Sequence, residues 1–455
     1  MTTKKVLGVD VSASSVTVHV LENYPKGGLK NYWEKTRNKA ALNYPSFFSN
    51  PSKRNQKTAW EFAEFVESEL PSLAILEPTG NHYSLLWARI LDSLGVDILW
   101  VGHVELRRYR AGKLLPNKSD PADALAMCAY ALDEDNHTES GDVDLRKYLL
   151  HRPDDINQIR ECCQQINHLS RVQSPIINYS RQMLAWQFPE VAKTDSTSSK
   201  VGNLPPLWGW LAQQYDRVDR GSVTRLDNKY VNSVAVKYGL EISPFLRSHA
   251  LWLCQIQDLE FDIDSRLRSL LENEKFLPYM RIFDDFGFGL RVRARILSRI
   301  YPFESFLKSD GRVWVEHETR EVKRTERNHT DGVTTIKRSA GDTKRTKRNR
   351  SRDMFKMRLG MGTTLEQSGD ALVEKPSGSS ICRMSLWQYV ICQLETGKLP
   401  DSKVAAELIL KRDELKSQVN AQGDKLLNGR HIQGKLMAKV ANMLFIELVT
   451  ALAVR

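Results

Sequence analysis

Short apolar runs and stretches with helical spacing alternate over about the first 135 residues. Residues 5–11 are largely apolar up to a carboxylate, Asp10, and residues 15–20 alternate with a period of two, so together they predict a β-hairpin. Three further strands are predicted, at residues Leu29–Trp33, 73–77 and 97–101. Helical spacing occurs at residues 60–66 and 85–94, and this order of elements predicts a mixed α/β sheet.

Longer helices are predicted from about residue 150 onward. One apolar stripe runs from Ile159 to Met183 and a second from Ile256 to Leu270, both near a three-four repeat. The two helices would form either an antiparallel coiled coil, joined near Pro205–Trp210, or two ordinary core helices, because neither stripe continues for many heptads. From about residue 354 the chain is again predicted to be helical, and the apolar run Val440–Val454 is too short to cross a bilayer.

The fold class that follows is α/β plus all-α, in three regions. Residues 1–135 form the mixed-sheet domain, residues 136–275 the helical coiled-coil or linker region, and residues 276–455 a helical C-terminal domain. The third region contains a basic insertion at residues 312–352.

The charge of the chain favours a polyanionic partner. The sequence has 66 Lys and Arg residues against 55 Asp and Glu residues, a formal net charge of +11, while 41% hydrophobic residues exclude a wholly disordered chain. Its six cysteines have no metal-ligand spacing and no secretory leader precedes them, so we expect a reduced, cytoplasmic and nucleoid-associated protein without structural zinc. No Walker loop or dinucleotide fingerprint supports ATP or NAD chemistry.

Residues 312–352 hold thirteen Lys and Arg residues and six Asp and Glu residues, a local excess of 13 − 6 = +7. A hairpin is predicted at Thr325–Ile336 with its turn at Asp331–Gly332, and a loop at Lys344–Arg352. The segment is either a solvated loop or a clamp on nucleic-acid phosphates, and self-repulsion without a polyanion favours the clamp. The candidate nucleic-acid contacts, which include a second basic stretch, are Arg107, Arg108, Arg110, Lys113, Lys323, Arg324, Lys337, Arg338, Lys344, Arg345, Lys347 and Arg348.

Four carboxylates stand at positions that could bring them together. Asp10 and Glu77 lie at the ends of predicted strands, and Asp120 and Asp123 lie three residues apart at the start of a predicted helix with Pro121 in its first turn and Asp120 as its cap. Each alone has a simpler interpretation, as a helix cap, a first-turn acid or a strand-end surface charge. Together they predict a site for Mg²⁺ or Mn²⁺, because several carboxylates cannot share a small site while ionised unless cations neutralise them.

Three separated motifs resemble the DEDD signature of the Piv/MooV-type transposases and site-specific DNA invertases, the insertion-sequence family known for bridge RNA. The motifs are Gly8-Val9-Asp10-Val11-Ser12, Leu76-Glu77-Pro78-Thr79-Gly80-Asn81-His82-Tyr83 and Lys118-Ser119-Asp120-Pro121-Ala122-Asp123-Ala124. The basic stretch 107–113 also resembles the one that the family carries there. The resemblance implies a RuvC-like, ribonuclease H-like fold for the first domain.

The C-terminal region resembles the transposase domain of the same family. Phe286-Gly287-Phe288-Gly289-Leu290 is similar to its Gly-x-Gly helical hairpin, and Gln367-Ser368-Gly369 is similar to the context of its catalytic serine. The resemblance implies Ser368 as a nucleophile that attacks a DNA phosphodiester with help from the metal-bound carboxylates. Without the resemblance, a serine beside a glycine is far more often a turn residue.

The function expected on these grounds is DNA transposition and recombination at element ends and target, performed by a homo-oligomer, a dimer or tetramer, and guided by a structured RNA. Two alternatives stay open. One is a RuvC-like, Mg²⁺-dependent junction-resolving endonuclease in which Ser368 plays no part, and the other is a non-catalytic nucleic-acid-binding relative.

Overall fold

The structure is a computed structural model of the 455-residue chain, and its contacts divide it into two compact units, Met1–His151 and Arg152–Arg455. The first unit extends beyond the predicted border at residue 135, and residues 136–275 do not form a unit of their own. The residues described are 5–13, 15–36, 42–45, 59–78, 80–116, 119–138, 141–144, 147–149, 154–197, 202–308, 310–330, 333–368, 371–418 and 427–453.

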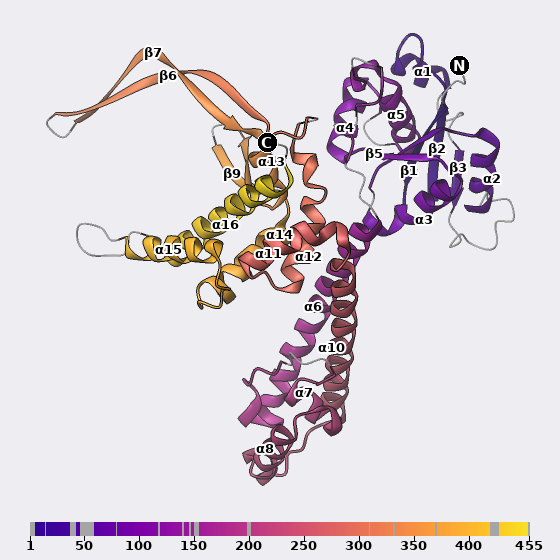
Figure 1. The fold of residues 1–455 in the computed structure, drawn as a ribbon. Coiled ribbons are helices and arrows are strands. Elements are labelled where there is room, and N and C mark those ends of the chain that lie inside the picture. Colours follow the sequence, from indigo (N-terminus) through magenta and orange to yellow (C-terminus); the bar gives the residue numbers. More distant parts are fainter. Residues whose placement is uncertain are drawn as a thin grey trace. The chain divides into compact units, whose positions relative to one another are not determined.

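A five-stranded mixed sheet organises the first unit, with the order β3-β2-β1-β4-β5 (Figure 1). The strand β1 pairs with β2, and β2 with β3, in antiparallel fashion, whereas β1–β4 and β4–β5 are parallel. The strands are β1 (Val6–Val11), β2 (Ser15–Leu21), β3 (Leu42–Pro45), β4 (Leu73–Leu76) and β5 (Asp97–Trp100). The α/β character of this unit therefore agrees with the sequence pattern.

Helices cover both faces of this sheet. The helices are α1 (Leu29–Thr36), α2 (Ala59–Glu69), α3 (Gly80–Ser93), α4 (His103–Gly112) and α5 (Asp120–Leu132). Val9 and Leu76 pack into one core with residues of α2 and α3, whereas Val6 and Ile75 pack into another with residues of α1, α4 and α5. Side chains of a strand alternate between its two faces, so Asp10 lies on the same face of β1 as Val6. This is the face that α5 covers.

The predicted third strand at Leu29–Trp33 is wrong, because this segment is the helix α1. Leu29 is buried, and Tyr32 and Trp33 pack against the same core, which is the three-four spacing of a helix face. The third strand lies later, at β3, where Leu42–Pro45 pairs with Ser15–Val18 of β2. A short segment with two aromatic residues is ambiguous between helix and strand until its packing is known.

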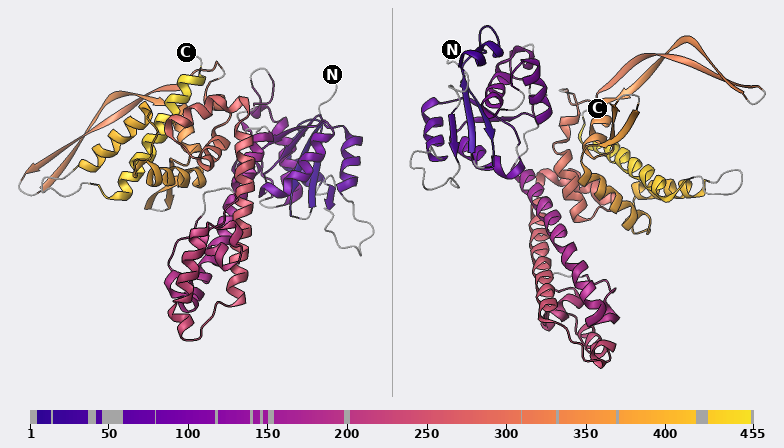
Figure 2. Two further views of the ribbon diagram at one scale, coloured as in Figure 1. Left: turned by 60° about the horizontal axis from the view of Figure 1, so that its bottom comes forward. Right: turned by 180° about the vertical axis from the view of Figure 1, so that it is seen from behind.

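The second unit is mostly helical, and two long helices run through it side by side (Figure 2). The helix α6 (Asp154–Gln187) packs on α10 (Pro244–Leu271). Arg266 donates to Gln158, and Ser180 lies 3.2 Å from His249, so the two helices are antiparallel. The remaining helices are α7 (Pro206–Leu211), α8 (Arg220–Val231), α9 (Val234–Lys237), α11 (Leu277–Phe286), α12 (Leu290–Ile300), α13 (Arg350–Arg358), α14 (Ser380–Tyr389), α15 (Lys403–Ser417) and α16 (Gly429–Leu452).

Two apolar cores hold these helices together. One contains residues of α6 and α10 through α16, including Ile159 and Ile166, and the other surrounds Trp208 and Trp210 of α7. Leu259, in the second predicted stripe, is 51% exposed. The paired helices thus combine both sequence interpretations, since they run antiparallel but also contribute to ordinary cores.

Two antiparallel hairpins interrupt the helical pattern of the second unit. The first consists of β6 (Val315–Thr330) and β7 (Val333–Asn349), and the second of β8 (Gly362–Ser368) and β9 (Ala371–Ser377). The predicted hairpin is confirmed by the pairing of Thr330 with Val333, although its turn residues, Asp331 and Gly332, lie outside the described residues.

Two expectations for this part of the chain are wrong. The loop predicted at Lys344–Arg352 is the end of β7 followed by the start of α13, because the ladder with β6 satisfies the backbone whatever the side-chain charges are. The continuous helical pattern predicted from residue 354 is broken by β8 and β9.

The Gly-x-Gly segment joins α11 to α12. Gly287 ends α11 with a φ of 68°, a left-handed conformation in which glycine is favoured, and Gly289 precedes α12. Tyr389 donates a hydrogen bond to the carbonyl of Phe286 and fixes this connection against α14. In the part of the chain that the structure describes, no helix is long and apolar enough to span a membrane.

Candidate functional site

Asp10 and Glu77 extend two neighbouring parallel strands at the same edge of the sheet. Val9 of β1 is in register with Leu76 of β4, so the residues that follow, Asp10 and Glu77, come next to each other. Glu77 is two residues after Ile75, whose side chain faces the α5 side, so alternation brings both carboxylates to that side. The expected placement at adjacent strand ends therefore agrees with the structure.

The helix α5 passes close to β1, which brings its first turn to the same edge. A β-carbon at Gly8 would overlap the carbonyl oxygen of Ala124, so only glycine permits this approach. Asp120 is the first residue of α5 and Asp123 lies in its first turn. Ser119, not Asp120, holds the cap position, and its side chain makes no capping hydrogen bond.

The carboxyl of Asp10 is partly buried and has a raised pKa. Loss of hydration raises this pKa from 3.8 to about 6, with a further contribution from the negative charge of Asp120, while Arg110 and a hydrogen bond from the backbone of Val11 act in the opposite direction. The carboxylates of the strand β1 and of the helix α5 are therefore close enough to repel each other.

The helix α4 supplies a basic side chain to each of the other two carboxylates. His103 contacts Glu77, and Arg110 donates to Asp123. The side chains of Arg110 and Asp123 are only 11% and 15% exposed, so this pair is shielded from water, whereas Glu77 is 14% exposed but its partner His103 is 60% exposed. Sequence reasoning missed His103, although its position directly after the fifth strand could have indicated the same sheet edge.

The donor chemistry at this edge suits Mg²⁺ or Mn²⁺. Carboxylate oxygens are the ligands these ions prefer, and the repulsion between Asp10 and Asp120 is what a divalent cation would relieve. Among the residues described, however, no group of three or more His, Cys, Asp or Glu side chains is arranged to hold a metal ion. Two of the four carboxylates, Glu77 and Asp123, contact His103 and Arg110 instead.

The basic stretch on α4 divides into two kinds of residue. Arg107 and Arg108 are exposed, as a nucleic-acid contact requires. Arg110 is engaged with Asp123, and Lys113 lies 2.6 Å from Asp133. Arg110 and Lys113 therefore have partners within the protein, and the structure gives them a positioning role that the sequence did not indicate.

The basic hairpin residues lie on the paired strands β6 and β7. Lys347 is exposed, and Arg348 is exposed but pairs with Asp353 at 3.0 Å. The remaining candidates are placed only through the backbone of the ladder, and they are Lys323, Arg324, Lys337, Arg338, Lys344 and Arg345.

Ser368 is the last residue of β8. It pairs with Ala371 of β9, so it lies at the tip of the second hairpin, next to a connection that falls outside the described residues. It belongs to the second unit, whereas the four carboxylates belong to the first.

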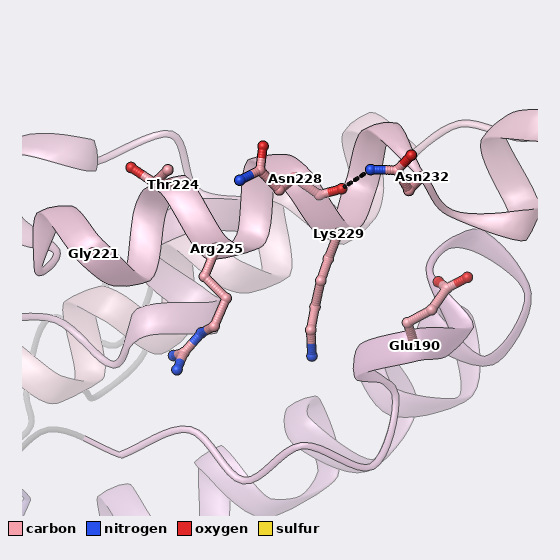
Figure 3. A pocket seen from close by; sticks show the side chains of 7 residues that line it. All are labelled: Glu190, Gly221, Thr224, Arg225, Asn228, Lys229 and Asn232. Atoms are coloured by element: carbon pink, nitrogen blue, oxygen red, sulfur yellow. Dashed lines mark hydrogen bonds between the residues drawn. The ribbon is translucent and has the colours of Figure 1, made fainter.

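A solvent-open hollow of about 790 Å³ lies along α8, away from the carboxylates in the sequence and in the other unit. Arg225 and Lys229 extend from one side of α8 at this hollow (Figure 3). Glu190, which also lines it, accepts hydrogen bonds from the Ser233 hydroxyl and the Val234 backbone amide. The role of Glu190 is thus to hold the start of α9.

No family model and no curated protein matches this chain. The roles of the carboxylates, the serine and the basic residues therefore depend on the three sequence motifs and on the geometry described above.

Proposed function

We propose that this protein is a Mg²⁺-dependent DNA recombinase of the transposase type. The observation that carries the proposal is the position of Asp10, Glu77, Asp120 and Asp123 at one edge of the mixed sheet. Asp10 and Glu77 extend adjacent parallel strands, and the charge of Asp120 acts on Asp10. A mixed sheet covered by helices also fits the RuvC-like fold that the motifs imply.

Asp10 and Asp120 are the first candidates to hold a divalent cation, because they already repel each other and lack a shared protein cation at ion-pair distance among the described residues. Glu77 and Asp123 would join them when His103 and Arg110 turn away. Such a cation would stabilise the negative charge that develops on a phosphodiester during cleavage. The protein's own contribution is to hold the four carboxylates on rigid elements, two strand ends and one helix start.

The proposed nucleophile is Ser368. Its hydroxyl would give up its proton as its oxygen forms a bond to phosphorus, the bond from phosphorus to the leaving sugar oxygen would break, and the leaving oxygen would take up a proton. A covalent phosphoserine retains the energy of the broken bond for strand exchange, which hydrolysis does not. The position of Ser368 at a hairpin tip is compatible with access to a large substrate.

Nucleic acid would be held by basic residues on the surface. Arg107 and Arg108 are exposed on the same helix that contacts the carboxylates, and Lys347 is exposed near the base of the first hairpin. An RNA guide and a homo-oligomer belong to this proposal only through the family resemblance.

Denaturing electrophoresis with labelled DNA in Mg²⁺ tests the proposal. The wild-type protein should cleave DNA and leave a protein–DNA adduct, whereas Ser368→Ala should lose both cleavage and adduct while it retains DNA binding. Asp10→Asn, Glu77→Gln and Asp123→Asn should each lose cleavage, because removal of a ligand weakens cation binding.

The matched control is Asp97→Asn, which removes an exposed carboxylate at the start of β5. Cleavage by Ser368→Ala at the wild-type rate, without an adduct in either protein, would replace the serine mechanism with a hydrolytic junction-resolving endonuclease. Unchanged cleavage by the carboxylate variants would contradict the site itself.

A further inference from the structure

Three arginines lie on three helices that border one core of the second unit. They are Arg160 of α6, Arg299 of α12 and Arg358 of α13, and α12 packs against both other helices. Each arginine directly follows or precedes a fully buried residue of one common core. These buried neighbours are Ile159, Ile300 and Leu359.

Among the residues that the structure describes, no acidic side chain pairs with any of these three arginines. Within the described part of the chain, Arg160, Arg299 and Arg358 have no ion pair and no hydrogen bond. Other arginines of α12 are paired with acids, which shows that this helix does not lack such partners elsewhere.

The paired arginines of α12 make the contrast clear. Arg291 donates to Glu260 and Asp264 at 2.9 Å each, and Arg293 lies 2.7 Å from Asp284. The sequence thus places acids opposite the first part of α12 and none opposite Arg299.

Arg295 extends the same row without supplying a negative charge. It lies four residues before Arg299, one helical turn away, and is 8% exposed. Its guanidinium donates to the hydroxyl of Ser385 and to the amide oxygen of Asn167, both neutral groups. These two partners hold Arg295 one helical turn from Arg299 and leave its positive charge in place.

Arg160 and Arg299 are half-buried and Arg358 is exposed, and the burial that matters is that of one atom of Arg160. The Nε atom of Arg160 is buried and has no hydrogen-bond partner. A buried donor on a charged group without a partner lowers stability more than an ordinary missing hydrogen bond does. Such an atom in a native protein needs a physical explanation, and a bound anion provides one.

The electrostatics agree with this geometry. Loss of hydration lowers the pKa of the Arg160 guanidinium, and the neighbouring charges of Arg299 and Arg358 lower it further. The charges of Arg299 and Arg358 therefore both act on Arg160.

We propose that Arg160, Arg299 and Arg358 form a binding site for a phosphate group of a nucleic-acid backbone. Planar guanidinium groups present paired donors that match the oxygens of a phosphate, and three of them from different helices surround an oxyanion better than a flat basic surface does. The net charge of +11 points to a polyanion as the source of that phosphate. The site lies in the second unit and involves none of the proposed catalytic carboxylates, so it stands independently of the proposed chemistry.

The test compares the wild-type full-length protein with Arg299→Gln and Arg358→Gln. The matched control is Arg293→Gln, which removes the same charge from the same helix but breaks a pair with Asp284. Binding to a fluorescent duplex DNA oligonucleotide and to a fluorescent single-stranded RNA is followed by anisotropy over a range of salt concentrations. Thermal unfolding is measured in parallel, with and without inorganic phosphate.

Arg299→Gln and Arg358→Gln should each weaken binding to one or both nucleic acids about tenfold, the loss of one charged hydrogen-bonding group. They should also reduce the slope of binding against salt by roughly 0.9 per lost phosphate contact. Without phosphate, Arg299→Gln should unfold at a higher temperature than the wild type, because one of three repelling charges is gone. Inorganic phosphate should raise the unfolding temperature of the wild type more than that of Arg299→Gln.

The control Arg293→Gln should show neither the stabilisation nor the change of the phosphate response. The proposal would be overturned if the wild type, Arg299→Gln and Arg358→Gln bound both nucleic acids with equal affinity. This holds even if inorganic phosphate stabilised the wild type, because the site would then bind free phosphate and not the phosphate of a nucleic-acid backbone. Destabilisation by Arg299→Gln together with an unchanged phosphate response would overturn it as well, because the arginine would then act in packing.

Discussion

The α-carbon of Gly8 on β1 faces the carbonyl oxygen of Ala124 on α5, with no room between them for a side chain. A β-carbon there would also lie 2.9 Å from the backbone nitrogen of Cys128. The Sγ atom of Cys128 in turn donates to the carbonyl of His19 at 2.9 Å, so α5 is fixed against both β1 and β2. This close packing sets the position of the helix whose first turn carries Asp120 and Asp123.

Gly8→Ala should therefore destabilise the first unit and displace α5. The expected loss is about 1–3 kcal/mol of unfolding free energy, the usual effect of inserting a methyl group into a packed core. Denaturant unfolding followed by tryptophan fluorescence measures it. Gly112→Ala is the control, because a β-carbon at Gly112 meets nothing within 4 Å, and an equal effect of both substitutions would contradict this account.

Asp10→Asn should stabilise the protein in the absence of divalent cations. The folded-state pKa of about 6 exceeds the ordinary 3.8, so the folded protein keeps its proton longer and the unfolding free energy falls as the pH rises from about 4 to 6. The variant lacks this pH dependence, and above pH 6 its unfolding free energy should exceed that of the wild type by on the order of 2 kcal/mol. Thermal unfolding of both proteins at a series of pH values checks this prediction. A stability difference between them that grows below pH 4 would contradict it.

His19 should produce the opposite dependence on pH. It is 4% exposed and lies 3.2 Å from the hydroxyl of Tyr32, and burial lowers its pKa from 6.5 to about 4. The unfolded chain then takes up the proton first, so the unfolding free energy falls as the pH drops from 6.5 to 4. Between pH 6.5 and pH 4, the wild type should lose on the order of 2–3 kcal/mol more unfolding free energy than His19→Gln. The quantity to compare is therefore the change of unfolding free energy with pH in each protein, not the stability at neutral pH.

Arg110→Gln should tighten the binding of Mn²⁺ at neutral pH several-fold. The substitution frees Asp123 from its ion pair and removes a positive charge that acts on Asp10. The negative charge of the carboxylates is then less neutralised, so they attract a divalent cation more strongly. The upward shift of the unfolding temperature on addition of Mn²⁺ should be larger than in the wild type. Arg107→Gln removes an exposed charge from the same helix and is the control, and a smaller Mn²⁺ response of Arg110→Gln would contradict competition between arginine and metal.

Neutralisation of Lys344, Arg345, Lys347 and Arg348 together should weaken nucleic-acid binding and reduce its salt dependence. Each lost phosphate contact lowers the slope of the binding constant against salt by roughly 0.9. The exposed pair of Arg348 with Asp353 contributes little to stability, so unfolding should change little. An unchanged slope in a salt titration would leave this hairpin without a role in binding.

Four strands of the first unit, β1, β2, β4 and β5, were predictable because they carry strong local patterns. Val6, Leu7, Val9 and Val11 are all nearly inaccessible to water, and a strand buried on both faces shows up in sequence as a continuous apolar run. The placement of Asp10 beside Glu77 then followed from the parallel order of the strands. The segment Leu29–Trp33 was not predictable in this way, because packing of its aromatic residues decides between helix and strand.

The full length of the first hairpin, the second hairpin and the basic partners of the carboxylates, His103 and Arg110, were not predicted from the sequence. The strands β6 and β7 are held by backbone hydrogen bonds, which leave no hydrophobic pattern in a charged segment. The pairs of His103 with Glu77 and of Arg110 with Asp123 join residues 26 and 13 positions apart. Such contacts depend on the path of the chain between them, and neither residue type nor spacing specifies them.

In the proposed function, the ladder between β6 and β7 would also set a length scale for contact with nucleic acid. The strand β6 has 16 residues, and at roughly 3.3 Å per residue its contour length is about 50 Å. Duplex DNA rises about 3.4 Å per base pair, so the hairpin matches a stretch of about 15 base pairs. Because every partner of β6 in the ladder lies on β7, removing one residue from each strand near the tip shortens this footprint by about one base pair and leaves the register nearer the base unchanged.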